Sequence, residues 1–145
     1  MKFLSSLILF IPFSVNIWLT NFDEAKKEAS QEHKFILLNF SGSDWCAPCI
    51  KMKKEIFGSD AFEKFAADKL VLANADFPRL KKNELTKDQQ KQNEALAEKY
   101  NPEGKFPLTI LLDENGKKIK EWQGFYNSSP EAFIAEIKGG AHANN

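Results

Sequence analysis

Three short runs of nearly continuous apolar residues are spaced along the chain, at 35–40, 70–75 and 108–112. Runs of this length, bounded by polar segments, are typical of strands that are buried on both faces, so we expect them to form the centre of a sheet. A shorter stretch near Trp18 and an alternating stretch over 117–122 predict two further strands, the second of them an edge strand.

Segments with the spacing of amphipathic helices lie between these strands. Residues that cap helices well stand at their starts: Thr20 or Asn21, Ser59 or Asp60, Thr86 and Ser129. Thr86 is followed by Gln89, which is the spacing of a capping box. A further helix begins at about residue 45. The predicted helices end at about Ser30, Phe57, Tyr100 and Gly139-Gly140.

The order of these elements predicts the fold class. Strands and helices alternate early in the chain, which favours parallel pairing, and the chain closes with an antiparallel hairpin and a helix. The hairpin turn holds Asn115-Gly116, a pair suited to positive φ. We therefore predict one α/β domain, with a central mixed β-sheet flanked by helices on both faces, and the length of 145 residues suits a single core.

The first fifteen residues differ from the rest of the chain. Lys2 precedes an apolar run that has the length of a signal-peptide core and is too short to span a bilayer comfortably. Neither an Ala-x-Ala cleavage pattern nor a lipobox cysteine follows it. We predict residues 1–15 to be a signal peptide or an uncleaved membrane anchor, and residues 16–145 to be the folded domain of an exported protein. A buried N-terminal strand is the alternative.

Charge and metal-ligand content argue against two classes of function. Lysine and arginine number 20, as do aspartate and glutamate, so the basic excess that is usual for nucleic-acid binding is missing. The histidines, His33 and His142, lie far in sequence from the two cysteines, so we expect no metal site.

The segment Trp45-Cys46-Ala47-Pro48-Cys49 holds the only cysteines of the chain. Two thiols at this spacing can close into a small disulfide ring and reopen. Because the segment joins a buried strand to a helix, the unpaired N–H groups at the helix start stabilise a thiolate at the first cysteine. We therefore expect Cys46 to be the nucleophile and Cys49, one turn into the helix and more buried, to be the resolving thiol.

The residues around the two thiols support this chemistry. Pro48 stands in the first helical turn, where a missing N–H costs nothing, and stiffens the ring that Ala47 completes. Trp45 provides a flat apolar surface beside the sulfur. Three alternatives remain: a permanent structural disulfide, a zinc site with distant ligands, or a coincidental pair in another fold.

The segment from Phe40 to Cys49 resembles the active-site segment of the thioredoxin superfamily, and Phe106-Pro107-Leu108-Thr109 resembles its cis-proline loop. The resemblance covers about 18–138 and is nearest to secreted bacterial thiol–disulfide interchange proteins. It implies a thioredoxin fold over 16–145, a cis peptide bond before Pro107, and a backbone at Phe106 that binds an extended substrate by strand addition.

Two features depart from the family pattern. Thioredoxins carry a buried aspartate beneath the second cysteine, and Asn39, which cannot take a proton, lies nearest to that position here. Asp44, Glu55 or water would have to replace it. The second departure is an insertion over about 77–100, interpreted as a solvated helix or, as an alternative, as a surface for substrates or partners.

The predicted function is thiol–disulfide exchange on protein disulfides outside the cytoplasm. No histidine lies between the cysteines to stabilise the reduced form, so we expect the reductase or isomerase direction, with an upstream thiol–disulfide electron donor. We expect a monomer that needs no cofactor besides the Cys46–Cys49 disulfide, and no nucleic acid or metal as partner. A binding or chaperone-like module with secondary redox activity is the alternative.

Overall fold

The computed structural model describes residues 16–144. The predicted leader over 1–15 lies outside the described residues. Among the helices of residues 16–144, none has the length and apolar character that crossing a membrane requires.

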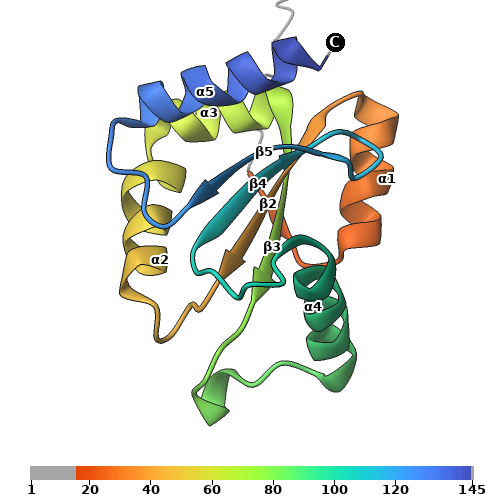
Figure 1. Ribbon diagram of the computed structural model, residues 1–145, viewed down its shortest axis with the longest axis vertical. Coiled ribbons are helices and arrows are strands. Elements are labelled where there is room, and N and C mark those ends of the chain that lie inside the picture. Colours follow the sequence, from red (N-terminus) through yellow and green to blue (C-terminus); the bar gives the residue numbers. More distant parts are fainter. Residues whose placement is uncertain (1–15, 145) are drawn as a thin grey trace, which may run out of the picture.

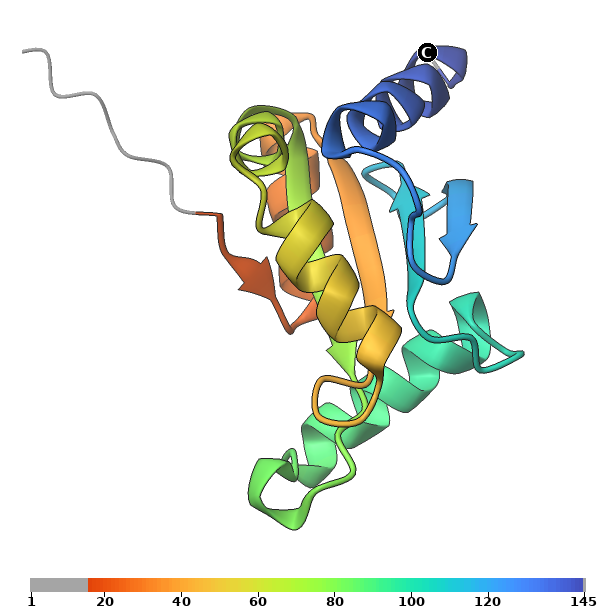
Figure 2. The same ribbon diagram turned by 90° about the vertical axis from the view of Figure 1, so that its left-hand side faces the viewer.

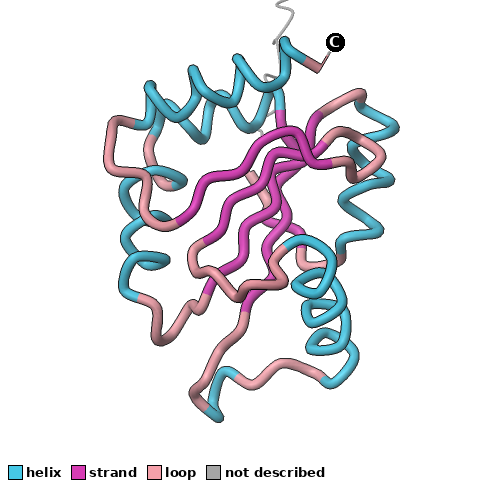
Figure 3. Tube along the Cα trace, viewed as in Figure 1, coloured by secondary structure: helices cyan, strands magenta, loops and turns pink. Residues whose placement is uncertain are grey.

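A mixed sheet of five strands forms the centre of the molecule (Figure 1). In sheet order the strands are β1 (Trp18–Leu19), β3 (Leu70–Asp76), β2 (Phe35–Ser41), β4 (Leu108–Leu112) and β5 (Lys118–Gln123). β1, β3 and β2 run parallel, whereas β4 pairs antiparallel with β2 and β5 antiparallel with β4. The predicted mixed sheet is confirmed (Figure 3). β2 and β3 are each one residue longer than expected.

Helices cover both faces of the sheet, as predicted (Figure 2). One face packs against α1 (Phe22–Glu32) and α4 (Lys87–Tyr100). The other packs against α2 (Ala47–Met52), α3 (Asp60–Lys69) and α5 (Pro130–Ala143). Alternate strand residues serve the two sides, because successive side chains of a strand point to opposite faces: Leu38 belongs to the first core and Leu37 to the second.

Side-chain caps fix the helix starts that the sequence predicts. Asn21, rather than Thr20, caps α1 by accepting hydrogen bonds from the amides of Asp23 and Glu24. The capping box at α4 forms only in part: Thr86 accepts from the amide of Gln89, at 3.2 Å. The Gln89 side chain instead donates to the carbonyl of Thr20 at 2.9 Å, and so ties α4 to the connection between β1 and α1.

The second predicted helix differs from expectation in its last turn. It begins at Ala47, inside the cysteine motif that the sequence predicts to open it, but α2 passes at Lys53 into a π-helical turn, Lys53–Phe57. The amide of Gly58 closes that turn on the carbonyl of Lys53, at 2.8 Å. The wider turn places both Ile56 and Phe57 in the core between α2, α3 and α5.

The predicted helix end at Gly139-Gly140 is wrong, and the positive φ predicted for the Asn115-Gly116 turn is confirmed at Gly116 alone. Helix α5 continues through Gly139-Gly140 to Ala143, because neither glycine takes a positive φ and Gly140 lies against the sheet. A Cβ there would stand 3.3 Å from Leu111 Cδ2. In the β4–β5 turn only Gly116 has a positive φ, since the Asp113 carboxylate accepts from the amides of Asn115 and Lys117 and sets a wider loop.

Candidate redox site

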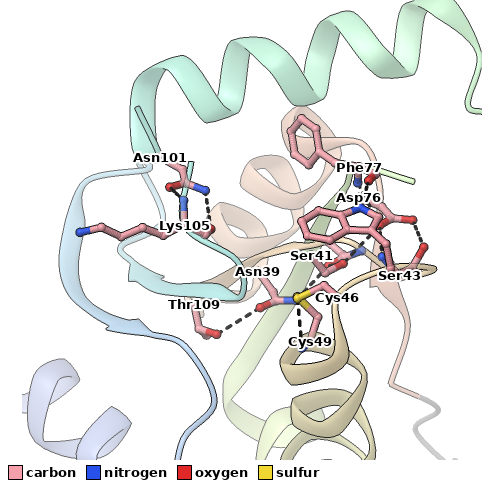
Figure 4. The surroundings of a disulfide bond; sticks show 12 residues. Asn39, Ser41, Ser43, Cys46, Cys49, Asp76, Phe77, Asn101, Lys105 and Thr109 are labelled. Atoms are coloured by element: carbon pink, nitrogen blue, oxygen red, sulfur yellow. Dashed lines mark hydrogen bonds between the residues drawn. A yellow bond between two sulfur atoms is a disulfide. The ribbon is translucent and has the colours of Figure 1, made fainter. Parts of the chain in front are cut away.

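The two cysteines lie where the chain leaves β2 and enters α2, at the carboxyl end of the parallel strands (Figure 4). They form a disulfide with 5.2 Å between their Cα atoms. Cys46 is the N-cap of α2, and its sulfur accepts the N–H of Cys49 at 3.3 Å. Ala47 and Pro48 occupy the first turn, so the helix begins with one amide donor fewer to satisfy.

Burial does not distinguish the two cysteines as the sequence predicts. Cys46 is 4% exposed and Cys49 is 5% exposed, so Cys49 is not the more buried of the two. The bond between their sulfur atoms holds both side chains at the same depth. They differ instead in their surroundings: Cys46 caps the helix, whereas Cys49 lines a cavity beneath it.

The Trp45 ring is fixed on several sides. Its indole N–H donates to the carbonyl of Phe77 at 2.7 Å, and the Phe106 ring stands edge-on to it, 5.5 Å between centroids. The Arg79 guanidinium lies 3.6 Å from the indole centroid. Gly42 makes this position possible, because a Cβ at residue 42 would fall 2.2 Å from an indole carbon.

The peptide bond between Phe106 and Pro107 is cis, as the family resemblance implies. Pro107 begins the approach to β4, and its carbonyl accepts the amide of Gly124 at 2.8 Å. Within residues 16–144, neither the N–H nor the carbonyl of Phe106 makes a hydrogen bond. The Phe106 ring contacts both Trp45 and Phe77, so this loop adjoins the cysteine segment.

A row of polar side chains crosses the sheet beneath the disulfide (Figure 4). Asn39 on β2 stands opposite Thr109 on β4 and Asn74 on β3. Its amide donates to Asn74 Oδ1 at 3.1 Å, and its carbonyl oxygen accepts from the Thr109 hydroxyl, also at 3.1 Å. Asn39 therefore lies near Cys49, where the family resemblance placed it, with one hydrogen bond at each end of its side-chain amide.

A second polar row lies one step nearer to the strand ends, where Ser41 pairs with Asp76. The Ser41 hydroxyl is 3.4 Å from Asp76 Oδ1 and equally far from Asn74 Oδ1. Ser43 donates to the same carboxylate twice, through its amide at 2.9 Å and its hydroxyl at 2.5 Å. The Phe77 amide also donates to Asp76 Oδ1, so this carboxylate joins β3 to the active-site loop.

A cavity of about 330 Å³ opens between the polar rows and α2. Cys49 lines it together with side chains of both rows and of the π-helical turn. The remaining lining residues are Trp18, Asn39, Ser41, Ser43, Ile50, Lys53, Phe57 and Asn74. The resolving cysteine that the sequence predicts therefore faces hydroxyl and amide groups rather than a closed apolar core.

Asp44 and Glu55, the predicted substitutes for a buried acid near Cys49, make contacts with other residues instead. The Asp44 carboxylate accepts from the amides of Arg79 and Leu80, at 2.9 and 3.0 Å, and from the Asn83 side chain. The Arg79 amide contributes most to holding the pKa of Asp44 below its usual range. Glu55 is exposed and 3.9 Å from Lys51. Asp44 instead attaches the insertion to the active-site loop.

The insertion is thus more than a solvated helix. Its first part, which contains the short helix η2 (Lys81–Asn83), lies beyond the ends of β2 and β3 (Figure 1). Asn93 on α4 is 2% exposed and donates to the Asp76 backbone carbonyl at 2.9 Å. A hollow of about 450 Å³ separates the loop from α4, and Asp76 lines its inner end.

Sequence reasoning missed Asn74, Asp76, Gly42 and Arg79. The signal for the first two is present: polar residues alternate at 39 and 41 in one predicted strand and at 74 and 76 in the next. Side chains two apart share a face of a strand, so the four had to lie together if the strands were neighbours in register. Gly42 and Arg79 carried no such signal, since their roles depend on the position of the Trp45 ring.

Among residues 16–144, no three His, Cys, Asp or Glu side chains gather as metal ligands would.

Comparison with known proteins places this geometry in a family. The model of the thioredoxin-like domain matches residues 22–140. The disulfide bond reductase DsbH of Chlamydia pneumoniae is 34% identical over 125 residues, which cover 86% of this chain and 73% of DsbH.

Two further comparisons agree. A solved structure of a DsbH oxidoreductase superimposes with a TM-score of 0.78 at 32% identity, covering 92% of this chain and 91% of the other. The thioredoxin-related protein DsbJ of Chlamydia pneumoniae is 30% identical over 113 residues, 78% of this chain but only 32% of DsbJ.

Proposed function

Because the chain belongs to the thioredoxin-like family and is a thiol–disulfide oxidoreductase, we propose that it reduces protein disulfides. In this proposal Cys46 is the nucleophile and Cys49 is the resolving thiol. The observation that carries the assignment is the hydrogen bond from the Cys49 amide to the Cys46 sulfur, at the start of α2. In the dithiol form this donor and the helix start favour the thiolate of Cys46.

The reaction proceeds in two exchanges. The Cys46 thiolate attacks a substrate disulfide and forms a mixed disulfide, which releases one substrate thiolate. Cys49 then attacks Cys46 Sγ, closes the Cys46–Cys49 bond and releases the second substrate thiolate. The two electrons come from the dithiol, so an upstream thiol–disulfide donor must return them before the next cycle.

A substrate strand is bound beside Phe106 and Pro107. The free N–H and carbonyl of Phe106 can pair with an extended chain, and Trp45 offers an aromatic surface next to Cys46. Arg79, stacked on the indole, adds a positive charge to the rim. Ala47 and Pro48 present no charged or bulky group between the two thiols.

The sequence and the relatives together support a direction and a location. No histidine separates the cysteines, and the relative DsbH is a disulfide bond reductase. With the apolar leader over 1–15, we infer an exported reductase that works outside the cytoplasm as a monomer, with no cofactor beyond its own disulfide. Retention of the leader would anchor it to the membrane.

Trapping of mixed disulfides tests the assignment of roles. Cys49→Ala should accumulate adducts at Cys46, because the second exchange is removed, whereas Cys46→Ala should capture none. Adducts at Cys49 in the Cys46→Ala variant, and none at Cys46 in the other, would reverse the roles.

The alternative of a binding or chaperone-like module makes a different prediction. Replacing both cysteines by serine should abolish insulin reduction. If the same variant keeps the protein's biological activity and suppresses aggregation as well as the wild type does, the redox assignment fails.

A further inference from the structure

Cys49 must lose a proton before it can attack the mixed disulfide, because the thiolate is the nucleophile. Asn39, the nearest side chain of the first polar row, cannot accept it. We propose that Asp76 is the proton acceptor for Cys49. The proton reaches it through water in the cavity that Cys49 shares with Ser41 and Ser43, and then through the hydroxyls of these two serines. The proposal rests on the assignment of Cys49 as the resolving thiol.

The geometry connects Cys49 to the Asp76 carboxylate through two hydroxyl groups. Cys49, Ser41 and Ser43 all line the cavity of about 330 Å³. Ser43 Oγ donates to Asp76 Oδ2 at 2.5 Å, and Ser41 Oγ lies 3.4 Å from Asp76 Oδ1. A carboxylate that already accepts from hydroxyls on the cavity wall is placed to take a proton that arrives through them.

Both hydroxyls can pass a proton on. In each contact the serine acts as donor, and no group among residues 16–144 donates to either Oγ. Their lone pairs are therefore available to water on the cavity side. The cavity has room for several water molecules at about 30 Å³ each, and the amide and hydroxyl groups on its wall, from Asn39, Ser41, Ser43 and Asn74, supply the polar partners that buried water requires.

The proton and the electron pair of Cys49 move in opposite directions in this step. Cys49 gives its proton to a water molecule, which gives one to a serine Oγ as that hydroxyl passes its own proton to Asp76. The Cys49 thiolate forms the bond to Cys46 Sγ, and the bond from Cys46 to the substrate sulfur breaks. Its electron pair leaves with the substrate thiolate. Asp76 also lines the hollow beneath the insertion, through which its proton returns to solvent.

Charged groups approach this path from both sides. Lys53, on the π-helical turn, lines the cavity with Cys49, and its ammonium favours the thiolate product. On the far side of Asp76, Arg79 and Lys81 line the hollow opposite Glu84 and Glu94, so the two signs are matched there. Lys53 is thus the one charged residue among those that line the cavity with Cys49.

The resolving step can be timed by itself. Reduced protein is mixed with 5,5′-dithiobis(2-nitrobenzoate): the first release of thionitrobenzoate reports attack by Cys46, and the second reports closure by Cys49. We expect Asp76→Asn to leave the first rate within about twofold and to slow the second at least tenfold below about pH 8, with the difference shrinking as pH rises toward the ordinary thiol pKa. Asp76→Asn keeps an oxygen for the Ser43 and Phe77 amides, so the loop should stay in place, which circular dichroism and Tm will verify.

Serine variants separate the relay from the loop contacts. Ser41→Ala plus Ser43→Ala should slow the second release like Asp76→Asn, since both routes to the carboxylate are lost. Asp88→Asn, on the exposed start of α4, is the matched control and should change neither rate. An unchanged second rate in folded Asp76→Asn overturns the proposal.

The roles of the cysteines are tested separately in the same assay. Cys49→Ser should show the first release only. Cys46→Ser should react with the reagent far more slowly than the wild-type first release. If Cys46→Ser instead reacts at that rate and Cys49→Ser does not, the assignment of Cys49 fails independently of Asp76.

Discussion

At the residue scale, Gly42 determines where the Trp45 ring can lie. The indole packs against the bare α-carbon of residue 42, which lets its N–H reach the Phe77 carbonyl and its face meet Arg79. No other residue type leaves that space free. The aromatic surface beside Cys46 therefore depends on a glycine outside the cysteine motif.

Gly42→Ala should displace the Trp45 ring. The added methyl group would overlap the indole, so we expect the Phe77 hydrogen bond and the Arg79 contact to break, with a loss of about 1–3 kcal/mol in the free energy of unfolding. Denaturant titration and the NMR signal of the Trp45 indole N–H measure the two effects. Gly139→Ala, which meets no atom within 4 Å, is the control and should be neutral or slightly stabilising. An unshifted Trp45 signal would contradict this account of Gly42.

At the element scale, a carboxylate on α5 binds the edge strand β5 and the loop that follows it. Glu136 accepts from the Trp122 indole N–H and the Tyr126 hydroxyl, both at 2.7 Å, and lies 2.9 Å from Lys120 Nζ. These donors, the Trp122 N–H first, lower the pKa of Glu136 from 4.5 to about 2. The same contact raises the pKa of Tyr126.

The contact predicts a loss of stability in acid. Because the folded pKa of Glu136 is lowered, its contribution is complete above pH 4.5 and disappears as the pH falls toward 2. Glu136→Gln should cost about 1 kcal/mol at neutral pH, a value reduced for solvent screening of a half-exposed group. Chemical denaturation from pH 7 to 2 should show the wild type and the variant converging in acid, and Glu131→Gln on the same helix should follow the wild type. Parallel curves for the wild type and Glu136→Gln would refute the assignment.

The elements themselves were predictable to different degrees. The buried strands and most helix caps followed from apolar runs and from Ser, Thr and Asn at helix starts, because both signals are local. The π-helical turn at Lys53–Phe57 and the passage of α5 through Gly139-Gly140 were not, since each depends on packing against distant elements. The cysteine site was predicted as a segment, whereas Asp76 required the register of β2 against β3.

At the scale of the whole molecule, the site combines a helix start with a polar sheet end. In the reduced protein, the Cys49 amide and the helix start stabilise the Cys46 thiolate, and no histidine lies between the thiols to stabilise it further. We expect a reduction potential nearer to about −270 mV than to the about −120 mV of strong oxidants. Equilibration with glutathione buffers measures it, and inserting a histidine by Pro48→His should raise the potential. A strongly oxidising wild-type value would remove the basis for the reductase direction.

The attachment of the insertion to the active-site loop has a mechanical consequence. Asp44 and Trp45 are adjacent in the chain, and each binds the 77–83 segment through a different contact. A force or partner that draws this segment outward therefore pulls on the residue immediately before Cys46. Movement of the insertion would therefore be transmitted through Asp44 and Trp45 to the nucleophile Cys46.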